Sequence, residues 1–256
     1  MTTADAPAPT GDFQTVPSHA EWMLLARDAY ERLVDTFAGL SAPDWSRPTP
    51  CDGWTVRDLA GHVVGSMRAA ATLRETISQQ RAVKRRAAET GEQEVDAMTA
   101  IQLERASDLD DQQVVDELHA LVGPALRGRS RLPGFVRHGA GFSVKMGSID
   151  ERWNLDYFFG CILTRDTWLH RIDLCDALGR EPDLDGNDRR IVGDVAMEWA
   201  RRHGRPAELM LTGPAGGRLS AGDGGDEITI DAIEFCRVVS GRTAHPHPLL
   251  AQEVPF

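Results

Sequence analysis

Hydrophobic side chains recur every three to four residues along four stretches within the first 182 residues of the chain. These stretches cover about residues 18–39, 55–67, 114–122 and 153–178. That spacing places the hydrophobic side chains on one face of an α-helix. Because four such faces can share one core, the pattern predicts a four-helix bundle over residues 17–182.

Local signals mark where two of these helices begin. Ser18 is followed three residues later by Glu21, and Thr55 is followed three residues later by Asp58. This spacing is typical of a capping box, in which the two side chains bind the free amides at a helix start. Gly39 ends the first predicted helix. We therefore expect helices that start after Ser18 and after Thr55.

Two segments of the predicted bundle lack a clear hydrophobic period. Residues 81–111 are rich in charge, which fits a solvated helical face or a flexible crossing segment. Gly123-Pro124 is expected to disturb the third helix, and residues 127–148 are rich in glycine and arginine. A loop of that length in a compact domain is often a lid or a substrate contact.

The pattern changes after Pro182. A helix through residues 191–200 ends at Gly204, and AELMLTG, GGRLSAG and DEITIDA then have the composition of short strands. GPAGGR and AGDGGD between them are expected to be hairpin turns, and DAIEFCRVVSGR a closing helix. The HPHP run near the end is expected to belong to a mobile tail.

These patterns predict an α+β fold, with a four-helix bundle and a small C-terminal α/β domain over residues 183–256. Residues 1–16 are rich in Ala, Pro and Thr, so we expect a disordered tail there.

Charge and cysteine content narrow the setting of the protein. The chain has 256 residues and a formal net charge of −11, which disfavours nucleic acid and anionic membranes as partners. Its four cysteines form no C-x-x-C pair, which fits a reducing compartment. The start of the chain lacks the features of a signal peptide, and no long apolar run is present. We therefore expect a cytoplasmic protein.

The chemistry is concentrated on the second and fourth predicted helices. Asp166 and His170 are four residues apart, so both lie on one helical face, and His62 is on the second helix. Two histidines and one carboxylate form a ligand set seen at catalytic zinc. Asp166 and His170 could instead form a hydrogen-bonded pair without a metal. Asp58, four residues before His62, could be a fourth ligand, a partner of the imidazole, or only a helix cap.

Other candidate residues have simpler interpretations. Asp173 could orient a neighbouring group, or pair with Arg171 or solvent. Cys51 and Cys175 have no obvious histidine partner in the sequence, so we expect them to be small buried hydrophobic residues.

Three blocks, PTPCDGWTVRDLAGHVV, TRDTWLHRIDLCDALGR and LTGPAGGRLSAGDGGDEITIDAIEFCRVVSGR, resemble the mycothiol-dependent maleylpyruvate isomerase family in order and spacing. The resemblance implies a DinB-like bundle that holds a divalent metal, usually zinc, and a C-terminal α/β domain that completes the site. It maps the family's metal ligands onto His62, Asp166 and His170. Asp166 stands where the family has glutamate. The resemblance also implies a site arginine, which Arg237 matches best.

Together, the residues and the resemblance predict an enzyme that uses a divalent metal, Zn²⁺, to activate mycothiol for attack on a small electrophile. The reaction would be that of an isomerase or an S-transferase. Arg237, or less readily Arg165 or Arg171, could pair with a substrate carboxylate. The alternatives are a non-catalytic metal- or small-molecule-binding protein and a zinc-dependent hydrolase. We expect a monomer or a small homo-oligomer.

Overall fold

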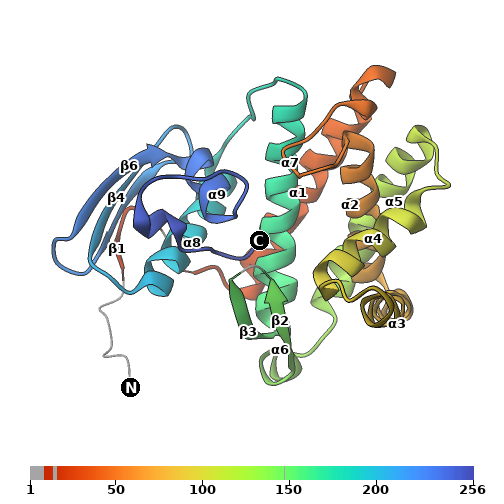
Figure 1. Cartoon of the computed structure of the whole chain (residues 1–256), viewed down its shortest axis with the longest axis horizontal. Coiled ribbons are helices and arrows are strands. Elements are labelled where there is room, and N and C mark those ends of the chain that lie inside the picture. The colour runs from red at the N-terminus through yellow and green to blue at the C-terminus, as the bar shows by residue number, and fades with distance from the viewer. Residues whose placement is uncertain (1–8, 14–15, 147) are drawn as a thin grey trace. The chain divides into compact units, whose positions relative to one another are not determined.

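The computed structural model describes residues 9–13, 16–146 and 148–256. The chain divides into two compact units (Figure 1). Residues 19–182 form the first, here called the bundle unit. Residues 183–256 form the second together with the described residues before 19, and it is here called the sheet unit.

Four helices form the main core of the bundle unit: α1 (His19–Ala38), α2 (Val56–Ala71), α5 (Asp111–Ser130) and α7 (Leu163–Ala177). Helix α1 packs against α5 and α7, and α2 packs against α5. Their buried side chains make one hydrophobic cluster, which includes Leu33, Leu59, Leu118 and Leu174. The bundle-plus-sheet architecture expected from the hydrophobic pattern is confirmed.

The start of α2 is fixed by the capping box that the sequence predicts. The Thr55 side chain accepts a hydrogen bond from the Asp58 amide, and the Asp58 carboxylate accepts one from the Thr55 amide at 2.9 Å. Each bond satisfies an amide that would otherwise lack a partner in the first turn. This cap sets the register of the helix that carries His62.

Replacing Thr55 by alanine should lower the free energy of unfolding by about 1 kcal/mol, since the Asp58 amide loses its acceptor. Thr55→Ser keeps the hydroxyl and should retain most of the stability. Urea unfolding of the three proteins measures the difference. Equal stability of the alanine and serine variants would contradict a capping role.

The charged segment between α2 and α5 folds as two helices, α3 (Leu73–Thr90) and α4 (Glu94–Ala106). They share a small core of Val83, Ala97 and Ile101, and the rest of their surface is mostly polar. Gly91 ends α3 with a positive φ of 77°, which glycine adopts without strain. The solvated-helix interpretation of this segment is therefore the correct one.

The loop expected over residues 127–148 is wrong. Helix α5 continues through Pro124 to Ser130, because Val122, Ala125 and Leu126 are all buried on its core face. A short helix α6 (Gly134–Gly139) and a hairpin of β2 (Gly141–Met146) and β3 (Ile149–Asn154) follow. The hairpin forms because Val144, Met146, Ile149 and Trp153 pack into a separate hydrophobic cluster.

The helix expected from Trp153 to Leu178 starts later than predicted. Trp153 lies in β3, and a π-helical segment, Tyr157–Ile162, leads into α7. The wider π-turn exposes carbonyl groups to the buried Arg129 side chain, which donates to Phe159 O at 2.7 Å and to Gly160 O at 3.3 Å. This guanidinium group anchors the start of the helix that carries Asp166 and His170.

The sheet unit contains α8 (Gly186–His203), β4 (Ala207–Thr212), β5 (Gly217–Ala221), β6 (Asp226–Asp231) and α9 (Ala232–Val239). With β1 (Thr10–Gly11), the strand order is β1-β5-β4-β6, in which β4 and β5 are antiparallel and β4 and β6 parallel. GPAGGR is therefore a hairpin turn. AGDGGD is not, because it carries the chain past β4 so that β6 pairs on the far side.

Both ends of the chain add to the sheet unit. Thr10–Gly11 form strand β1 against β5, so the expected tail is wrong for these residues, whereas residues 1–8 and 14–15 lie outside the described residues. The expected mobile tail after the HPHP run is also wrong. Leu249 and Leu250 are buried there, and the Trp199 indole donates to Leu249 O at 2.9 Å.

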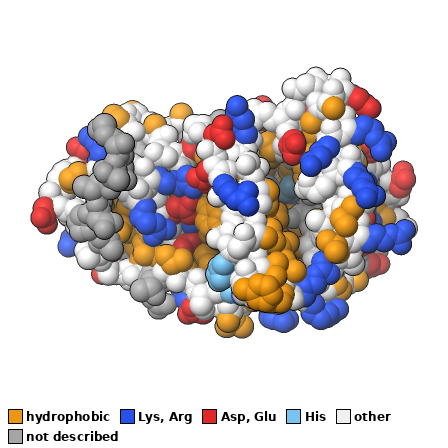
Figure 2. Space-filling view, turned by 90° about the horizontal axis from the view of Figure 1, so that it is seen from below, with side chains coloured by type: hydrophobic (Ala, Val, Ile, Leu, Met, Phe, Trp, Pro, Cys, Tyr) orange, Lys and Arg blue, Asp and Glu red, His pale blue; other side chains and the backbone are white. Residues whose placement is uncertain are grey.

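The described surface is mixed in character. Figure 2 shows basic, acidic and hydrophobic side chains on the same face. Phe135 on α6 is the most exposed large hydrophobic side chain described, at 81%. Within the described ranges, no helix is both long and apolar enough to cross a membrane.

Candidate metal centre

Helices α2 and α7 bring the three predicted ligands together. His62 comes from α2, while Asp166 and His170 are one turn apart on α7. Asp166 Oδ1 lies 3.2 Å from His170 Nε2, and Asp166 Oδ2 lies 3.7 Å from His62 Nε2. One donor atom from each residue lies within 4.8 Å of the other two. The carboxylate thus faces both imidazoles, one with each oxygen.

Trp54 packs beside both imidazoles. Its ring centroid lies 5.2 Å from that of His62 and 6.2 Å from that of His170. The two imidazoles meet edge to face, with centroids 5.0 Å apart and planes at 76°. The indole therefore restricts the rotation of two candidate ligands at once. The sequence pattern did not single out Trp54, since it lies in the connector before α2 rather than on a helix.

The histidine at position 62 is the clearest sign that the cluster fits a cation. Neither of its ring nitrogens has a hydrogen-bond partner among the described residues, although both atoms are buried. A buried polar group without a partner is costly, and native proteins rarely keep one without a reason. An imidazole lone pair that faces a carboxylate and a second imidazole fits a divalent cation such as Zn²⁺.

The charges of the cluster shift the pKa values of two residues. Burial raises the pKa of Asp166, but the facing His170 and His62 imidazoles outweigh burial and hold it well below its usual range. Burial lowers the pKa of His170, but Asp166, Asp173 and Cys51 outweigh it and hold the pKa well above its usual range. Without a metal, the pair is therefore an imidazolium facing a carboxylate.

This pair should make the stability of the metal-free protein depend on pH. The Asp166 contribution is present above its ordinary pKa of 3.8 and is lost as pH falls through its lowered pKa. The His170 contribution is present below its ordinary pKa of 6.5 and is lost as pH rises through its raised pKa. Relative to Asp166→Asn, the chelator-treated wild type should be most stabilised between those two values.

Urea unfolding of both proteins across the pH range measures this difference. A difference that does not change with pH would contradict the ion pair.

Two further residues contact His170 from the opposite side of its ring. Asp173 is fully buried, and its Oδ2 lies 3.2 Å from His170 Nδ1. The Cys51 thiol lies 3.4 Å from the same Asp173 oxygen and 3.9 Å from His170 Nδ1. The expectation that Cys51 has no histidine partner is therefore wrong. Only the i,i+3 spacing of His170 and Asp173 could have indicated this contact from sequence.

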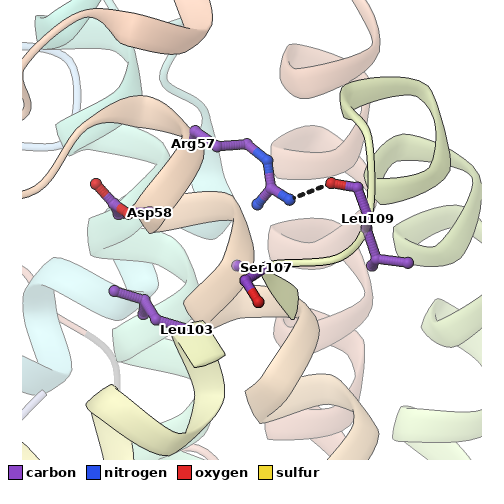
Figure 3. A pocket seen from close by; sticks show the side chains of 6 residues that line it. Arg57, Asp58, Leu103, Ser107 and Leu109 are labelled. Atoms are coloured by element: carbon purple, nitrogen blue, oxygen red, sulfur yellow. Dashed lines mark hydrogen bonds between the residues drawn. The ribbon is translucent and has the colours of Figure 1, made fainter. Parts of the chain in front are cut away.

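Asp58 does not join the cluster. Its carboxylate accepts from the Thr55 amide and, at 2.6 Å, from the Thr55 hydroxyl, so the capping interpretation is the correct one. Asp58 instead lines a pocket between α2 and α4 (Figure 3). There Arg57 donates to Leu109 O at 2.6 Å, and none of the three candidate ligands lines this pocket.

The candidate arginines are on α7 and α9. Arg237 is on α9 of the sheet unit, and its role in a site stays a prediction. Arg165 and Arg171 are on α7 and are buried, with 0% and 3% of their surface exposed.

The fold defines an α+β protein in which a helical bundle carries a cluster of two histidines and one carboxylate. The chain belongs to the mycothiol maleylpyruvate isomerase family, because the model of that family's N-terminal domain matches residues 26–175. No curated protein matches the sequence significantly.

Solved structures give the same fold. A crystal structure of the mycothiol-dependent maleylpyruvate isomerase aligns with a TM-score of 0.57 at 17% identity, over 89% of this chain and 90% of that one. A histidine-to-alanine mutant of that enzyme aligns with a TM-score of 0.56 at 16% identity, over the same shares. At these identities the likeness shows the fold.

Proposed function

We propose that this protein is a divalent-metal-dependent enzyme that activates mycothiol for attack on a small electrophile, most simply as an isomerase. The observation that carries the proposal is the convergence of His62, Asp166 and His170, in which the buried His62 ring nitrogens make no hydrogen bond among the described residues. Membership of the mycothiol maleylpyruvate isomerase family supports the choice of thiol and reaction. Arg237, from the sheet unit, would pair with a carboxylate of the substrate.

The three side chains would hold the metal, with Zn²⁺ the ion that two imidazoles and one carboxylate suit best. A bound divalent cation would favour the thiolate form of mycothiol over the thiol, and so supply a nucleophile at neutral pH. Asp166 is one methylene shorter than the glutamate that the resemblance implies. Its two oxygens nevertheless lie 3.2 and 3.7 Å from the two imidazole nitrogens, which supports a ligand role for the shorter side chain.

The chain's own residues would orient the ligands and exclude water. Trp54 packs against both imidazoles, and His170 keeps only 5% of its side chain exposed. Asp166 is 25% exposed and His62 is 14% exposed, so the cluster is more open on the side of Asp166. We infer that the thiol approaches from that side.

Isomerase and S-transferase reactions share their first step. The sulfur forms a bond to an electrophilic carbon of an activated double bond, and the π electrons move onto the neighbouring carbonyl group. In an isomerase, the new single bond rotates, the electrons return and the C–S bond breaks, so the thiol is released. In a transferase, the carbanion takes a proton and the thioether remains. The family match supports the first course.

The proposal is tested by metal analysis of the purified wild type, followed by assays with maleylpyruvate and mycothiol. About one equivalent of zinc and turnover that needs catalytic thiol are expected. Consumption of one thiol per product would indicate a transferase, and turnover without thiol would indicate a hydrolase. A folded wild type that takes up no added zinc would overturn the metal mechanism and favour a non-catalytic binding protein.

A further inference from the structure

His170 lies between two carboxylates, and each faces a different ring nitrogen. Asp166 Oδ1 is 3.2 Å from Nε2, and Asp173 Oδ2 is 3.2 Å from Nδ1. The two acids differ in surroundings, because Asp166 is 25% exposed and also faces His62, whereas Asp173 is fully buried. The two carboxylates therefore differ in position: Asp166 lies in the cluster with His62, and Asp173 lies on the other side of the His170 ring.

We propose that Asp173, assisted by Cys51, is a positioning residue that fixes the tautomer and the ring orientation of His170. The inference rests on the proposed function, since it concerns the way in which His170 would bind a metal. In the metal-bound state Asp173 Oδ2, 3.2 Å from Nδ1, would accept the Nδ1–H proton of His170 and leave the Nε2 lone pair for the cation beside Asp166 and His62. A carboxylate behind a histidine ligand holds the ring in place and raises the basicity of its free nitrogen.

Cys51 completes the arrangement around Asp173. Its thiol donates to the Asp173 oxygen that faces His170, at 3.4 Å. The residue lies in the connector before α2, whereas Asp173 lies on α7, so the contact links the segments that carry His62 and His170. A thiol is a weak hydrogen-bond donor, so it restricts the rotation of the Asp173 carboxylate without neutralising the charge that faces the imidazole.

Cys51, His170 and Asp173 form a second group with the spacing of a cation site, because their donor atoms lie within 4.8 Å of one another. The positions of the hydrogen-bond donors favour the positioning role. Asp173 Oδ2 faces both the Nδ1 of His170 and the thiol of Cys51, so one oxygen accepts from two donors. A second cation would require both donors to lose their protons. Metal stoichiometry separates the two interpretations.

The test compares Asp173→Asn with the wild type by zinc titration against a chromophoric chelator. The asparagine variant keeps the side-chain shape but removes the charge, and its amide can turn either an acceptor or a donor toward His170. The dissociation constant for zinc should rise about 10- to 100-fold, with the stoichiometry unchanged at about one. Cys51→Ser keeps a donor and should change the constant by no more than a few-fold.

Equal zinc affinity in the wild type and in folded Asp173→Asn would overturn the proposal, as would two equivalents of zinc in the wild type. If the wild type binds no zinc, the proposed function itself fails, and this outcome is distinct from the other two.

A second measurement does not depend on the variant. In zinc-loaded wild type labelled with ¹⁵N-histidine, the His170 ring should carry its proton on Nδ1. His170→Gln assigns the signal. A proton on Nε2 would overturn the proposal.

Discussion

His170→Ala should reduce zinc in the purified protein from about one equivalent to a trace. The substitution removes a ring that faces both Asp166 and Asp173, at 3.2 Å from each. A site left with one imidazole and one carboxylate is a weak zinc ligand set, so thiol-dependent turnover should also fall to background. Elemental analysis of proteins purified side by side measures the metal.

A matched control is available on the same unit. His119 lies on α5, is exposed and takes no part in the cluster, so His119→Ala should keep its full metal content. Because His170→Ala removes the imidazole that faces both Asp166 and Asp173, the variant should be checked for folding. His62→Ala serves as the second variant. Its ring makes no hydrogen bond among the described residues, although it faces Asp166 at 3.7 Å and packs against Trp54. His62→Ala should therefore lose zinc, with a smaller loss of metal-free stability than His170→Ala. Full metal content in a folded His170→Ala would contradict the site.

Much of the fold follows from local signals in the sequence. The helical period of α1 is continuous, and its buried residues include the predicted Trp22, Leu25 and Leu33. Thr55 and Asp58 form the predicted capping box, and Gly204 ends α8 in the left-handed conformation. These features could be predicted because each depends on residues within one or two turns of each other.

The parts that could not be predicted depend on contacts between distant segments. The β2–β3 hairpin has few buried positions of its own and is held by a hydrophobic cluster that includes Ile162. The π-helical segment depends on Arg129, which lies 30 residues before Phe159 in the chain. The parallel pairing of β6 with β4 places the third predicted strand beside the first rather than the second. A linear pattern contains no signal for such pairings.

In the candidate site, too, local spacing could be predicted from the sequence and contacts between distant segments could not. The i,i+4 spacing of Asp166 and His170 fixes their common face, and the helical pattern around His62 places the third candidate ligand on a second helix. Trp54 and Cys51 come from a connector without a helical period, and only the fold brings them to the imidazoles. The sequence therefore indicates the residues that would bind a metal, whereas the structure is needed to identify those that hold them in place.

Gly128→Ala should cause the largest loss of stability among single-methyl additions in the bundle core, about 3 kcal/mol. Gly128 lies where α5 crosses the end of α2, and a Cβ atom there would overlap the backbone carbonyl oxygen of Ala70. A backbone atom in a packed helix cannot turn aside as a flexible side chain can, so the two helices must separate. For a domain of this size the midpoint of thermal unfolding should fall by roughly 6–12 °C.

Gly123 provides the matched control, because it lies in the same helix and a Cβ there meets only the end of the Arg127 side chain, at 3.1 Å. Alanine at that position should stabilise α5 by about 0.5–1 kcal/mol, since alanine is the better helix former. If both glycine variants melted alike, the close approach of α5 to α2 would be wrong. Because α2 carries His62, a shift of this helix should also weaken zinc binding in Gly128→Ala and leave it unchanged in Gly123→Ala. Stability and metal affinity would then fall together in one variant only, which links the packing of the bundle to the geometry of the site.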